Sequence, residues 1–138
     1  MVPHREIERP REKPKVLLVD DNEEIRRLIP RVLANEYEVL VAKNGLEAKR
    51  LLEQHGGLPV VSDVSYPADG LDGLHRWMQD HDRKGIRKSA ILAISAMEFK
   101  QLQEFGESRG IEVLGKPFEM ANFLDKVSEL VRKHRTQQ

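Results

Sequence analysis

The chain alternates between short, mostly apolar runs and longer stretches in which apolar residues recur every three or four positions. The short runs predict strands that are buried on both faces of a sheet. They lie at residues 15–19, 37–41, 59–64, 90–95 and 111–114. The helical spacing predicts helices over residues 25–33, 46–55, 71–81, 98–107 and 118–133.

Strands that alternate with helices are typical of a parallel sheet with helices on both faces. We therefore predict an α/β fold, doubly wound, with a five-stranded parallel sheet and five helices. In open sheets of this kind, ligands bind at the carboxyl ends of the strands. The polar residues that directly follow each strand are thus the candidate functional residues.

The 138 residues fit a single domain, and the N-terminal segment differs from the rest. Half of residues 1–14 are charged and three are proline, so they cannot bury enough apolar surface to offset the entropy of ordering. We predict a flexible charged tail over residues 1–14 and one domain over residues 15–138.

Composition excludes several functions. The 23 basic and 23 acidic residues cancel, which argues against binding nucleic acid through bulk charge. Without cysteine there can be no disulfide, thiolate nucleophile or cysteine-bound zinc. No apolar run approaches the roughly 18 residues of a membrane span, and no signal-peptide pattern opens the chain. We expect a cytoplasmic protein with no membrane partner.

Carboxylates, a hydroxyl and an ammonium group follow the predicted strands. The residues concerned are Asp20, Asp21, Asp63, Ser95 and Lys116. Three carboxylates at one edge of a sheet repel each other, and a divalent cation removes that repulsion. An oxygen-only site suits Mg²⁺, and a nearby lysine suits phosphate oxygens. This set is what phosphoryl transfer requires.

Four stretches resemble the receiver domain of two-component response regulators. They are VLLVDDN (16–22), VVSDVSYP (60–67), AILAISA (90–96) and VLGKPF (113–118). The resemblance covers residues 15 to about 134, and it points to the stand-alone type, such as the chemotaxis regulator. It implies a flavodoxin-like receiver fold with strand order 2-1-3-4-5.

The resemblance also implies a role for each strand-end residue. Asp63 matches the phosphoacceptor, and Asp20 and Asp21 match the acidic pair that holds Mg²⁺. The backbone carbonyl of Ser65 would be a further metal ligand. Ser95 matches the hydroxyl residue that hydrogen-bonds the phosphoryl group, and Lys116 matches the lysine that contacts it. A histidine kinase or histidine phosphotransfer protein would donate the phosphoryl group, and an unidentified downstream protein would read the change. Such a protein assists its own phosphorylation and dephosphorylation and is no enzyme for an external metabolite.

The chain departs from the family pattern at two places. Val113 stands where the family commonly has the Tyr or Phe that acts as a switch, and a stiff branched side chain cannot make that swing. The loop after Asp63 is about two residues longer, because Ala68–Leu71 precede Asp72-Gly73. These departures motivate an alternative function, a receiver-like module that binds proteins without phosphorylation.

Simpler explanations exist for each motif taken alone. Asp20-Asp21-Asn22 can cap a helix, Asp63 can be a turn residue, and Pro117 can open a helix at its favoured first position. A small phosphohydrolase with an aspartyl-phosphate intermediate would need a second Asp two residues after the first, where this chain has Asn22. The histidines, at 4, 55, 75, 81 and 134, show no metal-ligand spacing and are expected at the surface.

Overall fold

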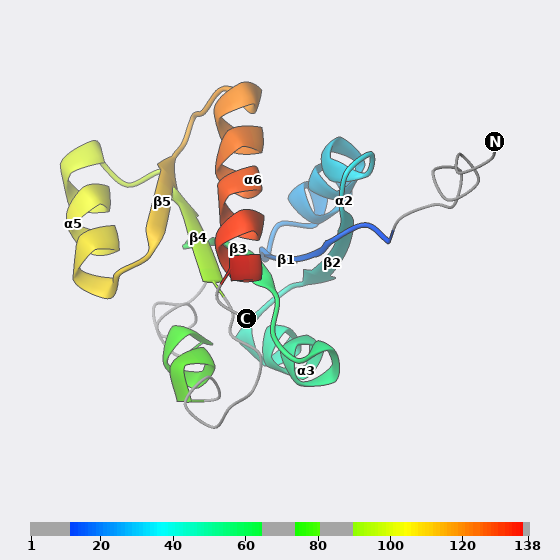
Figure 1. Ribbon diagram of the computed structural model, residues 1–138. Helices are drawn as coiled ribbons and strands as arrows, with labels where there is room; N and C mark the ends of the chain where they lie inside the picture. The colour runs from blue at the N-terminus through cyan, green and yellow to red at the C-terminus, as the bar shows by residue number, and fades with distance from the viewer. Residues whose placement is uncertain (1–11, 65–73, 81–89, 137–138) are drawn as a thin grey trace.

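The computed structural model describes residues 12–64, 74–80 and 90–136 (Figure 1). The strands are β1 (Lys15–Val19), β2 (Glu38–Ala42), β3 (Pro59–Asp63), β4 (Ala90–Ser95) and β5 (Glu112–Gly115). The helices are α2 (Glu23–Leu33), α3 (Gly45–His55), α5 (Phe99–Arg109) and α6 (Met120–Thr136), and residues 74–80 are also helical. Each predicted strand and helix has a counterpart in the described residues, and the ends that can be compared lie within three residues of the predicted ones. The predicted ends of the helix over residues 71–81 lie outside the described residues.

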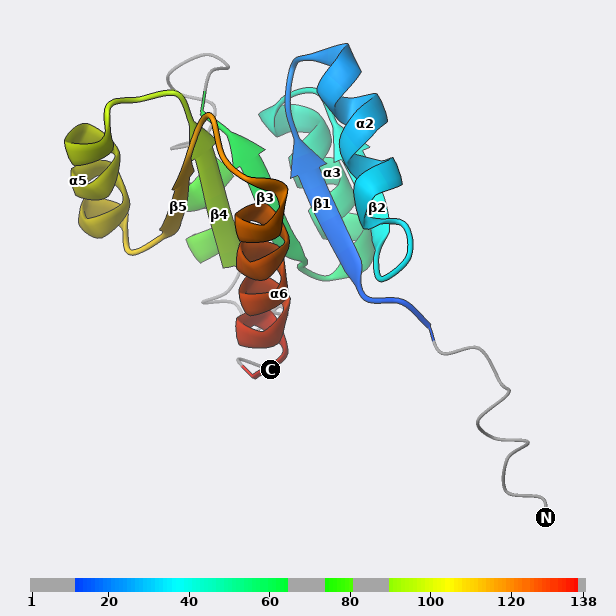
Figure 2. The same ribbon diagram turned by 90° about the horizontal axis from the view of Figure 1, so that it is seen from above.

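All strand pairs in the five-stranded sheet are parallel, and the order is β2-β1-β3-β4-β5. The predicted fold class and strand order are therefore confirmed. The order reverses at β1, since β2 lies on one side of it and β3 on the other. In Figure 2 the strands lie side by side, and the arrowheads of β1 and β3 point to the same edge of the sheet. This is the edge at which doubly wound sheets hold their ligands.

The sheet is covered on both faces. Figure 1 shows α2 and α6 over one face, α3 and the helix at 74–80 over the other, and α5 beside β5. Successive side chains of β1 point to opposite faces of the sheet. Val16 and Leu18 pack with α2 and α6, whereas Leu17 and Val19 pack with α3. Burial on both faces explains why the strands are apolar runs and not alternating patterns.

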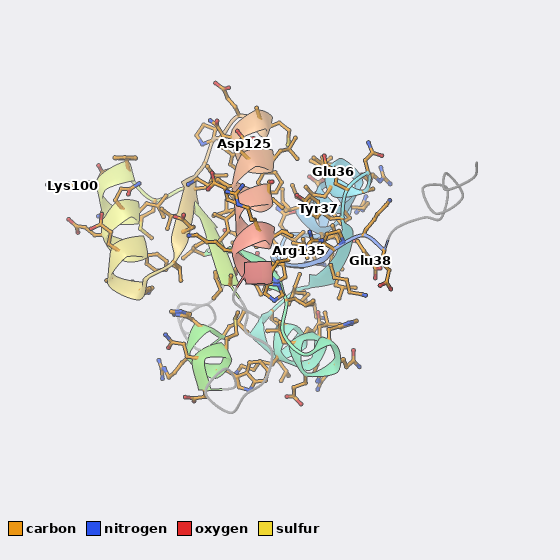
Figure 3. The ribbon with its side chains drawn as sticks, viewed as in Figure 1. Glu36, Tyr37, Glu38, Lys100, Asp125 and Arg135 are labelled. Carbon is orange, nitrogen blue, oxygen red and sulfur yellow. The ribbon has the colours of Figure 1, made fainter. Side chains whose placement is uncertain are left out.

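Tyr37 joins α2 to α6 within the helix layer on one face of the sheet. It lies between α2 and β2 and is buried against the core that includes Phe123 and Val127 of α6. Its phenol is hydrogen-bonded to the Ser128 side chain, and Figure 3 shows it near the α6 end that carries Arg135. Burial, and the nearby Glu36, raise the pKa of Tyr37.

Two side chains do not lie where their spacing or residue type suggests. Leu28 shares the helical spacing of the apolar residues in α2, but 52% of it is exposed because the core contacts of α2 come from Ile25, Ile29 and Leu33. His134 was expected at the surface, but it is buried in the last turn of α6. In the part of the chain that the structure describes, no helix is long and apolar enough to cross a membrane.

Candidate functional site

Three carboxylates meet at the carboxyl edge of the sheet. Asp20 and Asp21 directly follow β1, and Asp63 is the last residue of β3. One oxygen from each lies within 4.8 Å of the others. Asp20 and Asp63 are buried, with 2% and 5% of their surface exposed, whereas Asp21 is exposed to solvent. The predicted acidic residues are thus brought together, with one side open to solvent.

Strand register puts Asp20 and Asp63 at the same level. Val19 lies opposite Ser62 in the β1–β3 pair, so the next residue of each strand is a carboxylate. The Asp20 backbone N–H donates to the Ala42 carbonyl at 3.0 Å, which extends the β1–β2 ladder by one hydrogen bond. Asp20 is therefore fixed by the sheet, and Asp21 begins the turn into α2.

In the turn after β1, one residue caps α2 and its two neighbours contribute carboxylates to the acidic cluster. Asn22 is the N-cap of α2, and its side chain accepts from the backbone N–H of Glu24 at 2.8 Å and of Ile25 at 3.2 Å. The Asn22 backbone N–H donates to Asp20 Oδ1 at 2.8 Å. The helix-capping interpretation is correct for Asn22, and it leaves the carboxylates of Asp20 and Asp21 to the cluster.

The cluster disfavours charge on Asp20. Burial is the largest cause that raises the pKa of this carboxyl above its ordinary value of 3.8. The negative charges of Asp63 and Asp21 raise it further, while the hydrogen bond from Asn22 N–H and the Lys116 ammonium oppose the shift. A cation placed among these oxygens would relieve the repulsion.

Lys116 directly follows β5 and reaches the cluster. Its Nζ lies 3.5 Å from Asp63 Oδ1, and its backbone N–H donates to the Ser95 carbonyl at 2.7 Å. The Lys116–Pro117 bond is cis, and α6 begins only at Met120, so Pro117 does not open that helix. The Phe118 ring stacks on Phe123 at a centroid distance of 5.3 Å, which anchors the segment after Lys116 to α6.

Ser95 ends β4 one residue beyond the pairing of Ile94 with Asp63. Its side chain is buried, and Oγ accepts a hydrogen bond from the Met97 N–H at 3.0 Å. That bond ties the hydroxyl to the loop that leads into α5. The serine proton stays available to an acceptor, because Oγ can donate one hydrogen bond while it accepts another. Ser65 lies outside the described residues.

The donor set fits a hard divalent cation. Among the residues that the structure describes, it consists of three carboxylates, one of them exposed, without histidine, and these three acids outnumber the one ammonium group that lies beside them. Mg²⁺ prefers oxygen ligands and keeps several waters, so an open cluster suits it. Asp20, Asp21 and Asp63 are the residues that would hold it.

Residues 16–128 match the sequence profile of the response regulator receiver domain. The chain belongs to that family. The polar-differentiation response regulator DivK of Brucella anthropi is 29% identical over 115 residues, which cover 81% of this chain and 91% of DivK. The transcriptional regulatory protein GltR of Pseudomonas aeruginosa is 28% identical over 120 residues, and this chain spans 49% of GltR.

Solved structures agree on the fold. The chemotaxis protein CheY4 of Vibrio cholerae is 25% identical with a TM-score of 0.70, over 86% of this chain and 98% of that one. A complex of the Saccharomyces cerevisiae histidine phosphotransfer protein Ypd1 with the receiver domain of Ssk1 matches with a TM-score of 0.74 and 21% identity. That match covers 87% of this chain and 90% of the matched one.

Two features did not follow from sequence reasoning, one beside the site and one in the packing of α5 on β5. Arg26 donates from its guanidinium to the Asp20 carbonyl at 2.9 Å, but an arginine in a charged helix gives no signal that separates it from its neighbours. Gly106 in α5 lies so close to β5 that an added Cβ would be 2.7 Å from Val113 Cγ1. A glycine inside a helical pattern is a weak signal of such close packing.

Proposed function

We propose that this chain is a phosphoacceptor receiver in two-component phosphorelay signalling, phosphorylated on Asp63 in a Mg²⁺-dependent step that switches partner binding. The observation that most strongly supports it is the arrangement around Asp63. A buried carboxylate lies 3.5 Å from an ammonium group and within 4.8 Å of two further carboxylates, at the open edge of the sheet. The family assignment fits this chemistry.

In the proposed reaction, a carboxylate oxygen of Asp63 attacks the phosphorus of a phosphohistidine. The new O–P bond makes an acyl phosphate, the P–N bond breaks, and its electron pair goes to the imidazole, which takes up a proton. Bound Mg²⁺ would neutralise charge on the phosphoryl oxygens. Lys116 would hold one of those oxygens by its positive charge, and Ser95 would donate a hydrogen bond to another. The chain would assist its own modification and hydrolysis and would transform no external metabolite.

The donor would be a histidine kinase or a histidine phosphotransfer protein. The fold-level likeness to a receiver solved together with a histidine phosphotransfer protein supports that class of partner. We further propose that a downstream protein reads the switched state on α5, β5 and α6. A groove of about 250 Å³ lies there, lined among others by Gly106, Val113 and Lys133. We place this signalling in the cytoplasm, with no nucleic acid or membrane partner.

Intact mass after incubation with a small phosphodonor and Mg²⁺ tests the proposal. The wild-type protein should gain one phosphoryl group, Asp63→Asn should gain none, and omission of Mg²⁺ should suppress the gain. Asp125→Asn, at an exposed position on α6, is the matched control and should react like the wild type. An undiminished gain in Asp63→Asn would assign the acceptor elsewhere.

A receiver-like binding module that does not use phosphorylation is the second candidate. Its support is Val113, which packs closely against Gly106 of α5 and has no aromatic ring that could rotate as a switch. Retention of the acidic residues and Lys116 weighs against it, since such a module does not need them. If the wild-type protein gained no phosphoryl group yet still bound its partner, this second function would be favoured.

A further inference from the structure

Arg26 makes a contact that its neighbours on α2 do not share. Its Nη1 donates to the backbone carbonyl of Asp20 at 2.9 Å, across six residues and in a partly buried setting. Arg27, the next residue, is largely exposed and forms a surface ion pair with Glu23 at 3.5 Å, one helical turn away. The two arginines are adjacent in sequence, but one points to the strand end and the other to solvent.

The Asp20 carbonyl needs a partner from outside the sheet. Asp20 N–H makes its ladder hydrogen bond with Ala42, the last residue of β2. Beyond Ala42 the chain turns away toward Asn44, the N-cap of α3, so the ladder cannot continue past this point. A buried carbonyl without a partner is costly, and the Arg26 guanidinium supplies the donor.

This contact lies where Asp20 and Asp21, the proposed ligand residues, follow the end of β1, so it bears on the placement of their carboxylates. Asp20 has a second tie through its side chain, which accepts from the Asn22 N–H, but Asp21 is exposed and follows the fixed carbonyl directly. A rigid, always charged guanidinium is well suited to hold a carbonyl in one orientation. Outer partners that orient metal ligands commonly change metal affinity by about 10–100-fold.

We infer that Arg26 is a positioning residue for the metal site: it holds the backbone after β1 so that the carboxylates of Asp20 and Asp21 converge with Asp63. The inference rests on the proposed function, because it assumes that the cluster binds Mg²⁺. Arg26 itself touches neither the cation nor the phosphoryl group. Its removal therefore weakens Mg²⁺ binding through geometry and leaves the acceptor carboxylate in place.

Calorimetric titration of the metal-free protein with Mg²⁺ tests this, with Arg26→Gln compared against Arg27→Gln. Arg26→Gln should raise the Kd for Mg²⁺ by about 10-fold or more. Arg27→Gln, a matched loss of charge at the adjacent position, should leave the Kd within about twofold, as expected for an exposed ion pair. Asp21→Asn marks the Kd of a site that has lost a ligand.

Two further measurements separate positioning from general stability. Arg26→Lys retains one donor for the carbonyl, so it should recover part of the lost affinity, and it serves as the folded variant if Arg26→Gln unfolds. Thermal melts in excess chelator give the stability of each metal-free variant. Equal Mg²⁺ affinity in the Arg26 and Arg27 variants would overturn the inference alone, whereas a wild-type protein that binds no Mg²⁺ would overturn both it and the proposed function.

Discussion

Asp20 links the electrostatics of the site to folding stability. Burial and the neighbouring carboxylates raise the pKa of Asp20 above its ordinary value of 3.8. Between pH 3.8 and the raised pKa, the folded state therefore binds more protons than the unfolded state. The free energy of unfolding of the metal-free protein therefore falls as pH rises from 3.8 through the raised pKa. We predict that Asp20→Asn raises this free energy at neutral pH by about 0.5–2 kcal/mol, the usual range of a stabilising substitution, measured by chemical unfolding in chelator.

The pH dependence provides the control for this prediction. The stability difference between Asp20→Asn and the wild type should shrink as pH falls and should disappear well below pH 3.8, where the carboxyl is protonated in both states. Asp125→Asn, exposed on α6 as Figure 3 shows, should change stability little at either pH. A lower melting temperature for metal-free Asp20→Asn at neutral pH would contradict repulsion within the cluster.

Lys116 is expected to matter more for switching than for accepting the phosphoryl group. Bound cation would already neutralise part of the charge, so Lys116→Ala should still gain one phosphoryl group, more slowly, in an intact-mass assay. The loss of its contact with the product should, however, remove the change in amide chemical shifts that accompanies phosphorylation. Lys100→Ala, on the exposed face of α5, is the control. A phosphorylated Lys116→Ala with wild-type shift changes would show that another residue carries the switch.

For single residues, the sequence predicted which side chains would meet. The alternation of strands and helices indicates a parallel sheet, in which the residues that follow the strands lie at its carboxyl edge. Asp20, Asp21, Asp63 and Lys116 do come together. It could not divide roles within Asp20-Asp21-Asn22, since capping depends on backbone geometry that only the turn defines. It could not predict the contact of Arg26 with a backbone carbonyl, which carries no pattern in the sequence.

The contact between α5 and β5 depends on a residue without a side chain. A Cβ on Gly106 would lie 2.7 Å from Val113 Cγ1 and 2.9 Å from the Ile111 carbonyl oxygen. In a helix interior, alanine is normally more favourable than glycine by about 1 kcal/mol of folding free energy. Here we predict the opposite sign: Gly106→Ala should lower the free energy of unfolding by about 1–3 kcal/mol, as overpacking does. Urea unfolding would measure it.

Two other variants define the cause of that loss. Gln101→Ala, at an exposed position on the same helix, should be close to neutral. Adding Val113→Ala to Gly106→Ala should recover only part of the loss, because the Ile111 carbonyl remains in the way. If Gly106→Ala stabilised the protein, α5 would be free to move away from β5, and the close packing would not constrain it.

The bounds of α3 followed the sequence closely, because Asn44 caps its start with a side-chain acceptor and Gly56 ends it with a left-handed backbone. Asn22 and Gly110 also cap helices, but α2 begins and α5 ends two residues beyond the predicted positions. The orientation of side chains was less predictable. Leu28 has helical spacing but faces solvent, because the spacing allows a wider stripe than the core of α2 uses. His134 is buried although its type favours the surface, since α6 packs along its whole length.

For the molecule as a whole, the sheet joins Asp63, the proposed acceptor, to the segments that would respond to its phosphorylation. Asp63 lies beside Ile94 across the β3–β4 pair, and Ser95 lies opposite Gly115 across the β4–β5 pair. The Lys116 N–H then bonds the Ser95 carbonyl. Charge added at Asp63 is therefore two strands away from β5 but close to the Ser95 hydroxyl. A ligand shifts an equilibrium only through its different affinity for the two states, and in the proposed function these contacts would supply that difference.

The segment expected to respond to phosphorylation is the loop after β4, because this loop is hydrogen-bonded to Ser95 whereas β5 is closely packed. Val113 is packed beneath Gly106, so β5 has little room to rearrange, and its branched side chain has few rotamers. The loop after β4 is coupled to the site, because Met97 N–H donates to Ser95 Oγ. Movement of Ser95 toward a phosphoryl oxygen should pull this loop and the start of α5, where 75% of Phe99 is exposed.

We therefore predict that phosphorylation, or beryllofluoride as its mimic at Asp63, perturbs residues 95–105 more than residues 111–115. Amide chemical shifts or hydrogen exchange with and without the mimic would measure this, with Asp63→Asn as the control that should show neither change. Ser95→Ala should reduce the changes in the 95–105 segment while Asp63 still reacts, since the Ser95 hydroxyl is the side chain by which this segment would contact the phosphoryl group. Changes centred on Val113 beside a quiet loop would overturn this route, because they would require the packing against Gly106 to open first. Silence in both segments would instead favour the module that binds its partner without phosphorylation.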